Sequence, residues 1–169
     1  ELANTNQIPF TPYYGTVDAT PLFLILLTEY VKWTGDFEFV KEMQMTVDGA
    51  LTWINEYGDR DGDLFLEYHQ ESSKGIANQG WKDSGDSVVH RSGEYAKTPI
   101  ALVEVQGYVY QAKMGIASLY DQLNKTNEAN SLREEAELLR KKFNEAFWME
   151  DVSFYAIALD EHKHQVGTI

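Results

Sequence analysis

The segment TPIALVEVQGYVYQAKMGIASLYDQLNKTNEANSLREEAELLRKKFNEAF, residues 98–147, contains two successive helical patterns. Its apolar residues recur at intervals of three and four, which is typical of amphipathic helices. The pattern predicts one helix from Thr98-Pro99 to about Asn124 and a second over about 127–147. The expected inward positions of the second helix are Ala129, Leu132, Ala136, Leu139, Phe143 and Phe147. We therefore expect a mainly α-helical fold.

A similar helix pair is expected earlier in the chain. Thr20-Pro21 matches Thr98-Pro99 as a helix start, with threonine as the N-cap and proline at the first helical position. This helix should end at Gly35, and the next should run from its N-cap Asp36 to Gly58. Two residues separate the helices, so they should form an antiparallel hairpin. The first helix is apolar on most sides and should be buried on more than one face.

Short strands are expected after each helix pair. The Asp-Gly turn within 59–63 predicts a strand over Leu64–Tyr68, while Phe154–Leu159 and Gln165-Val166 predict a second strand pair around the turn at 160–164. Repetition of helix, helix and hairpin predicts stacked units, as in a toroid of concentric helix layers. We expect residues 1–169 to be one partial toroid domain and a fragment of a larger protein.

Composition limits the possible partners. Lys and Arg number 14 against 27 Asp and Glu, a formal net charge of −13, which argues against binding nucleic acid or anionic membrane surfaces. The absence of cysteine excludes a thiolate nucleophile and is compatible with a cytoplasmic location, which we expect. The 13% aromatic content in so acidic a chain fits a neutral polar ligand such as a sugar. We expect no cofactor.

The densest polar cluster lies in the aperiodic stretch 69–97. It reads Gln79-Gly80-Trp81-Lys82-Asp83-Ser84-Gly85-Asp86-Ser87. Carboxylates can bind sugar hydroxyls, an indole can stack on a pyranose ring, and glycines let the backbone approach a ligand. An ordinary surface loop pinned by Trp81 is the alternative. In an extended stretch Asp83 points to the same side as Trp81, which would raise the pKa of its carboxyl, whereas Asp86 should be more hydrated.

Polar and charged residues also occur in two turns and inside one apolar helix. Asp59, Asp61 and Asp63 resemble a calcium loop, but the glycine stands at the fourth position and Gln70 at the twelfth, so we expect a solvated turn without calcium. His162 and His164 have no third ligand nearby, and we expect no metal site there. Glu104 and Gln106 interrupt an apolar helix, where an unpaired polar group is costly. We expect both to face a polar cavity rather than a partner.

Three segments, 13–21, 78–87 and 101–108, resemble the catalytic region of the bacterial amylo-α-1,6-glucosidase (glycogen-debranching-like) family. The resemblance extends from residue 13 to about 160. It implies an (α/α)6 toroid of the six-hairpin glycosidase clan and inverting hydrolysis by two carboxylic residues. It places the general acid at Asp83 and a sugar-binding acid at Asp18. The family's general base lies further along the barrel, and no segment here matches it.

The expected substrate is an oligosaccharide or α-glucan. The expected substrate-binding residues are Tyr14, Asp18, Trp81, Lys82, Asp86, Glu104 and Gln106. One alternative is a trehalase-like or mannosyl/glucosylglycerate hydrolase-like enzyme of the same clan, for which Lys82 and Arg91 could supply a basic subsite. Another is a non-catalytic helical carbohydrate-binding domain. Without a base, the isolated chain should release no glucose, and its uncovered helix faces favour self-association.

Overall fold

The computed structural model describes residues 4–5, 15–71, 75–82 and 84–168. This part of the chain is mainly α-helical, as predicted. The helices are α1 (Ala19–Thr34), α2 (Phe37–Glu42), α3 (Gln44–Thr52), the π-helical turn η1 (Trp53–Gly58), α4 (Val103–Gln122) and α5 (Thr126–Phe147). The strands are β1 (Ala101–Leu102), β2 (Trp148–Met149), β3 (Phe154–Tyr155), β4 (Ala158–Leu159) and β5 (Gln165–Val166). None of the described helices is long and apolar enough to cross a membrane.

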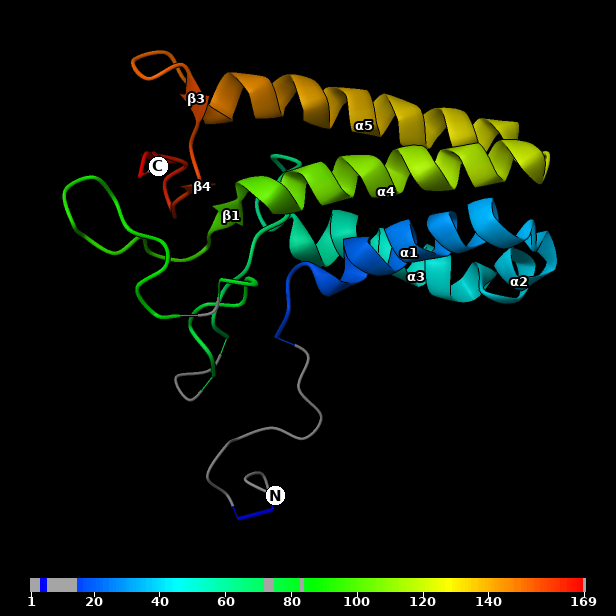
Figure 1. Cartoon of the computed structure of the whole chain (residues 1–169), viewed down its shortest axis with the longest axis horizontal. Helices are drawn as coiled ribbons and strands as arrows, with labels where there is room; N and C mark the ends of the chain where they lie inside the picture. Colours follow the sequence, from blue (N-terminus) through cyan, green and yellow to red (C-terminus); the bar gives the residue numbers. More distant parts are fainter. Residues whose placement is uncertain (1–3, 6–14, 72–74, 83, 169) are drawn as a thin grey trace.

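The helices lie side by side with their axes roughly aligned (Figure 1). Helices α1 and α4 begin at the same end of this bundle, where α5 ends. The irregular segment between η1 and β1 gathers at that end, together with the short strands (Figure 1). The loops that carry the sequence motifs are therefore concentrated at one end of the bundle.

The link between the helices of the first pair has the structure that the sequence predicts. Gly35 adopts φ +70°, and its N–H donates to the carbonyl of Val31 at 2.8 Å, which ends α1 as predicted. The carboxylate of Asp36 accepts the N–H of Phe39 at 3.0 Å and so caps α2, also as predicted. The expected N-cap at Thr20 is wrong, because α1 begins at Ala19 with Asp18 in the N-cap position.

The second helix of this pair is divided. It breaks between α2 and α3 at Met43, and its last turn is π-helical and ends at Gly58. The described segments still pack on α1 and form the expected hairpin.

The helix expected from Thr98-Pro99 begins later. Tyr68 and Ile100 form an isolated antiparallel bridge, and Ala101 and Leu102 form β1 before α4 starts at Val103. Strand β1 pairs with β4, which pairs with β5, both antiparallel. Pairing with a strand far along the chain therefore overrides the local helix-start signal.

The strand predictions are confirmed only in part. No strand forms at Leu64–Tyr68, where the one regular pairing among the described residues is the Tyr68–Ile100 bridge. The expected strand Phe154–Leu159 is divided, because Phe154–Tyr155 pairs with β2 and Ala158–Leu159 pairs with β1 and β5. Strand β5 and helix α5 lie where the sequence places them.

One face of α1 packs against α4 at close range. A Cβ placed on Gly115 would lie 2.7 Å from the hydroxyl oxygen of Thr28, so the glycine permits this approach. The opposite face of α1 is bare, because Leu26 is 68% and Trp33 88% exposed. The expectation that α1 is buried on more than one face is therefore wrong for the described part of the chain. Self-association through this face stays a prediction.

The close approach of α1 and α4 predicts opposite effects for two glycines of one helix. Gly115→Ala should lower the free energy of unfolding by about 1–3 kcal/mol, because the added methyl overpacks against the β-branched Thr28. Gly107→Ala is the matched control, since its Cβ would meet no atom within 4 Å. It should raise stability by up to about 1 kcal/mol through helix propensity. Urea unfolding curves measure both, and equal effects would contradict this packing.

Candidate functional site

The three motif segments meet where α1 and α4 begin. The N–H of Val17, just before α1, donates to the carbonyl of Gln79 at 3.1 Å. The backbone of Gly80 lies against β1, since a Cβ there would be 2.4 Å from Cδ1 of Leu102. Glycine at this position lets the loop approach the start of α4. Segments far apart in the sequence are thereby joined at one place.

Trp81 completes this junction. Its indole Nε1 donates a hydrogen bond of 2.8 Å to Oε1 of Glu104 in the first turn of α4. The Trp81 side chain is nevertheless 62% exposed, and Nζ of Lys82 lies 5.4 Å from the centre of its ring. The same Glu104 carboxylate also affects Tyr68. Burial of Tyr68, with a smaller contribution from this carboxylate, raises the pKa of its hydroxyl to about 12, so the hydroxyl stays protonated. The junction thus combines a fixed indole with a carboxylate.

The loop after Gln79 is organised by Asn78, which the sequence did not single out. Asn78 is buried, and its Nδ2 lies 2.5 Å from the carbonyl oxygen of Lys82, 3.0 Å from that of Ser84 and 2.5 Å from Oγ of Ser87. Its Oδ1 accepts the N–H of Gly80 at 3.1 Å. The Asn78 side chain therefore supplies hydrogen-bond partners to backbone groups of a loop whose described residues form no strand from 78 to 87. An asparagine at the head of a glycine-rich motif was the available signal.

The other predicted residues differ in their surroundings. Asp18 is buried in the N-cap position of α1, without a capping hydrogen bond from its side chain. Asp86 is exposed, in line with its expected hydrated setting. Tyr14 and Asp83 lie outside the described residues. Their roles stay predictions.

Gln106 does not face a polar cavity. It is 1% exposed, its Oε1 accepts the N–H of Leu66 at 2.8 Å, and its Nε2 donates to the carbonyls of Leu66 and Leu102, both at 2.9 Å. The expectation is therefore wrong for Gln106, because buried backbone groups of an irregular segment use its amide. Its partners assign it to holding the loop rather than to binding a sugar.

The aspartate turn contains a cation from the chain itself. The carboxylate oxygens of Asp59, Asp61 and Asp63 lie within 4.8 Å of one another. Asp59 accepts backbone N–H groups of the turn, while Nζ of Lys163 lies 3.2 Å from Asp61 and 3.0 Å from Asp63 and also contacts Glu67. The prediction of a solvated turn is therefore incomplete, because Asp61 and Asp63 form ion pairs with Lys163. The absence of bound calcium stays a prediction, which this ammonium group favours.

Glu67 is the buried member of this cluster. Burial raises the pKa of its carboxyl, although Lys163 opposes the rise. Burial alone would lower the pKa of the Lys163 ammonium, but the carboxylates of Glu67 and Asp63 hold this pKa above its usual value. Within the described residues, Oε2 of Glu67 is buried without a hydrogen-bond partner. The ionised form of Glu67 is therefore stabilised by Lys163.

His162 and His164 form the turn before β5. Their backbone N–H groups donate to Oδ1 of Asp160 at 2.9 and 2.8 Å. Burial opposes ionisation of Asp160, but these two hydrogen bonds and the nearby histidines lower the pKa of its carboxyl. In the part of the chain that the structure describes, the side chains close enough to share a metal ion are those of the aspartate turn, not these histidines.

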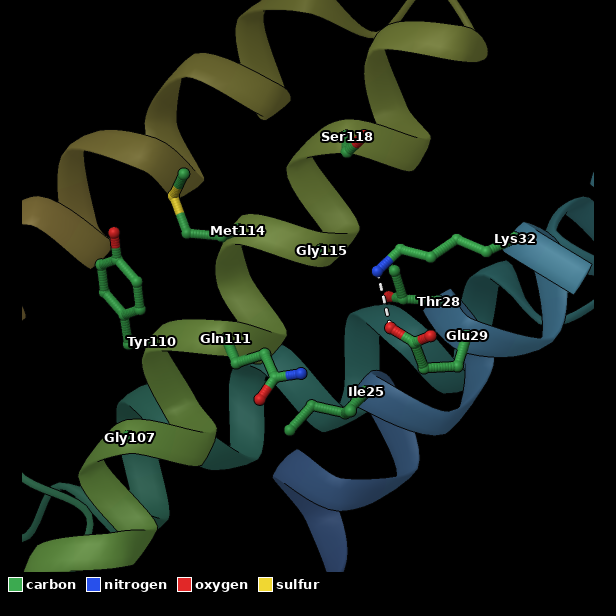
Figure 2. A pocket seen from close by; sticks show the side chains of 10 residues that line it. All are labelled: Ile25, Thr28, Glu29, Lys32, Gly107, Tyr110, Gln111, Met114, Gly115 and Ser118. Carbon is green, nitrogen blue, oxygen red and sulfur yellow. Dashed lines mark hydrogen bonds and ion pairs between the residues drawn. The ribbon is translucent and has the colours of Figure 1, made fainter.

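A separate groove of about 550 Å³ lies between α1 and α4 (Figure 2). An ion pair of 2.6 Å between Glu29 and Lys32 lies on its α1 side. The lining residues are Ile25, Thr28, Glu29, Lys32, Gly107, Tyr110, Gln111, Met114, Gly115 and Ser118. Gly107 of the third motif segment lines it, but none of the predicted site residues that the structure describes does.

The fold and the junction define a mainly helical protein in which an exposed indole is hydrogen-bonded to a carboxylate. A family model described as amylo-alpha-1,6-glucosidase matches residues 2–167. The chain therefore belongs to the amylo-α-1,6-glucosidase family, as the motifs predicted. The comparison with curated proteins finds no match.

The buried pair of Glu67 and Lys163 predicts a pH-dependent effect on stability. Lys163→Met leaves the Glu67 carboxylate unpaired and should lower the free energy of unfolding at pH 7.5 by about 2–4 kcal/mol. The variant should raise the pKa of folded Glu67 further above its unfolded value. The loss is then full above the raised pKa of folded Glu67, shrinks as the pH falls from that pKa towards about 4.3, and is smallest below about 4.3, where Glu67 is protonated in both states.

Lys97→Met is the control, because Nζ of Lys97 lies 3.9 Å from Glu161 and its side chain is 78% exposed. It should change stability by less than about 1 kcal/mol at either pH. Denaturant unfolding at pH 7.5 and pH 4 measures both variants. A Lys163→Met loss that is equal at the two pH values would refute the dependence on Glu67.

Proposed function

We propose that the protein carrying this chain hydrolyses α-glucosidic bonds, as an amylo-α-1,6-glucosidase does, at the junction of the three motifs. The hydrogen bond between Trp81 and Glu104 is the observation that carries the proposal. It joins the second and third motifs and fixes the indole edge while most of the side chain stays exposed. Membership of the family supplies the reaction class. The proposed substrate is an oligosaccharide or α-glucan.

The residues at the junction support distinct roles in binding. The exposed indole of Trp81 provides a flat surface for the C–H face of a glucose ring, and Lys82 next to it can donate to hydroxyls. Glu104 accepts from the indole with one oxygen, which leaves its other lone pairs for a hydroxyl. We assign hydroxyl binding also to Asp18, Asp86 and Tyr14.

For the chemistry we propose an inverting mechanism with Asp83 as the general acid. In such enzymes the acid protonates the glycosidic oxygen, while a general base activates water on the opposite face of the sugar, with the two carboxyl groups about 6.5–9.5 Å apart. We place the base outside residues 1–169, since no segment matches the family's motif for it. We further propose that the helix pairs form part of an (α/α)6 toroid and that the protein acts in the cytoplasm.

The two alternatives from the sequence receive less support. A glycosylglycerate hydrolase needs cations for the glycerate carboxylate, but the guanidinium of Arg91 is engaged by Asp151 and by the carbonyl of Gly167, each at 2.7 Å. Lys82 would then have to supply the subsite without it. A non-catalytic carbohydrate-binding domain would bind sugar without hydrolysing it. Glucose release from α-1,6-linked glucans distinguishes such a domain from the proposed hydrolase.

Replacement of the two loop aspartates separates acid catalysis from binding. In the protein that carries this chain, Asp83→Asn should lower kcat by about 10²–10⁴-fold with little change in KM, the usual effect of a lost general acid. Asp86→Asn should instead raise KM more than it lowers kcat, because it removes ground-state binding. Steady-state kinetics on an α-1,6-linked glucoside measure both.

An activated aryl glucoside, whose leaving group needs no proton, provides the control. It should restore turnover to the Asp83→Asn variant and not to the Asp86→Asn variant. Rescue of Asp86→Asn alone would show that the acid is assigned to the wrong aspartate.

A further inference from the structure

We infer that a second carbohydrate-binding site lies in the hairpin cavity, a cavity of about 460 Å³ between the chain segments 90–97 and 160–161. None of the predicted site residues that the structure describes lines it. The inference rests on the proposed function, which supplies the ligand: the hairpin cavity holds glucose units of an α-glucan beyond those at the motif junction. Its volume is within the range of about 300–1,000 Å³ that is usual for ligand pockets.

The first wall of the hairpin cavity is a β-hairpin within the stretch that the sequence shows as aperiodic. Val89 and Tyr95 form an antiparallel bridge. The turn between them closes through two hydrogen bonds of 2.8 Å, from the N–H of Gly93 to the carbonyl of His90 and from the N–H of His90 to the carbonyl of Glu94. Gly93 adopts φ +90°, the left-handed region that favours glycine in a hairpin turn. The hairpin therefore presents Tyr95 from a defined backbone position.

The second wall is the turn that begins at Asp160, and two contacts join it to the hairpin. The N–H of Glu161 donates to the carbonyl of Lys97 at 3.0 Å. Nε2 of His90 lies 3.3 Å from Oδ2 of Asp160, whose other oxygen accepts two backbone N–H groups of its own turn. Because these contacts fix the two walls to one another, the hairpin cavity is formed before a ligand binds.

The polar side chains around the hairpin cavity match a neutral ligand that is rich in hydroxyl groups. Nζ of Lys97 lies 3.9 Å from Oε1 of Glu161, which is too far for a hydrogen bond. The ammonium can therefore donate to a hydroxyl, and the carboxylate can accept from one. Glu94 and Asp160 add two further carboxylates to the described lining, so the cavity disfavours an anionic ligand.

Tyr95 supplies an aromatic surface for a sugar ring. It lines the hairpin cavity and is 63% exposed. Trp81 of the motif junction is 62% exposed, and the irregular segment that carries both residues gathers at the end of the bundle where α1 and α4 begin (Figure 1). A large aromatic side chain exposed beside a cavity is typical of a binding surface. Two such rings at one end of the bundle suit a chain of glucose units rather than a single sugar.

The test compares a long and a short substrate in the protein that carries this chain. Tyr95→Ala should raise KM for glycogen about 5–20-fold, because it removes the aromatic surface that binds the additional glucose units. KM for isomaltose should stay within about twofold, since its two rings bind at the motif junction. Tyr95→Phe keeps the aromatic ring and should leave KM for both substrates within about twofold. Steady-state kinetics measure all four values.

Tyr57→Ala is the matched control, because Tyr57 is 66% exposed in η1 and does not line the hairpin cavity. It should leave KM for both substrates within about twofold. Electrophoretic retardation in gels that contain glycogen provides a readout that does not depend on turnover. Tyr95→Ala should raise the dissociation constant obtained in this way about fivefold or more, and Tyr57→Ala should not.

Glu161→Gln keeps the inference testable if Tyr95→Ala does not fold. It removes the carboxylate and keeps the length of the side chain, so KM for glycogen should rise about 2–5-fold while KM for isomaltose is unchanged. Equal changes in KM on the two substrates, or unchanged retardation of Tyr95→Ala beside normal turnover, would overturn the inference and leave the proposed function intact.

The retardation assay also separates the inference from the proposed function. If the unaltered protein releases no glucose from any α-glucoside, the proposed function fails. A loss of retardation confined to Tyr95→Ala then still supports the hairpin cavity as a carbohydrate site, whereas equal retardation of Tyr95→Ala and Tyr57→Ala overturns it.

Discussion

The buried amide of Gln106 holds the irregular segment after η1 on helix α4. Its oxygen accepts the N–H of Leu66, and its nitrogen donates to the carbonyls of Leu66 and Leu102. These bonds satisfy the buried N–H and carbonyl of Leu66, which lie in a segment without regular secondary structure and would be costly to leave without a partner. Because Leu102 directly precedes α4, the same contact fixes the helix turn that presents Glu104 to Trp81. The candidate site therefore depends on a side chain that plays no part in the proposed chemistry.

Local signals in the sequence were sufficient for most of the helical fold. Gly35 and Asp36 end one helix and begin the next because their effects on the backbone are contained within a few residues. The start of α4 could not be predicted in this way. Ala101 and Leu102 become a strand because they pair with Leu159 and Ala158, more than fifty residues later. Periodicity within a window of the sequence carries no information on such a partner.

The candidate site was also predicted only in part from the sequence. The sequence predicted that Trp81 and Glu104 serve one site, and they are hydrogen-bonded. It gave the wrong environment for Gln106, because a polar residue inside an apolar helix can satisfy buried backbone as well as line a cavity. It also did not indicate Lys163 as the cation of the aspartate turn, since that contact joins segments about a hundred residues apart.

In the proposed function, the second and third motifs act as one site through the hydrogen bond between Trp81 and Glu104. A double-mutant cycle of Trp81→Phe and Glu104→Met, with kcat/KM measured on an α-1,6-linked glucoside, shows whether the two residues are coupled in catalysis. The first change removes the indole donor and keeps an aromatic ring, and the second removes the acceptor and keeps the length of the side chain. If the two residues act together, the two changes should show a coupling energy of about 1 kcal/mol or more. Effects that add within about 0.3 kcal/mol would contradict it.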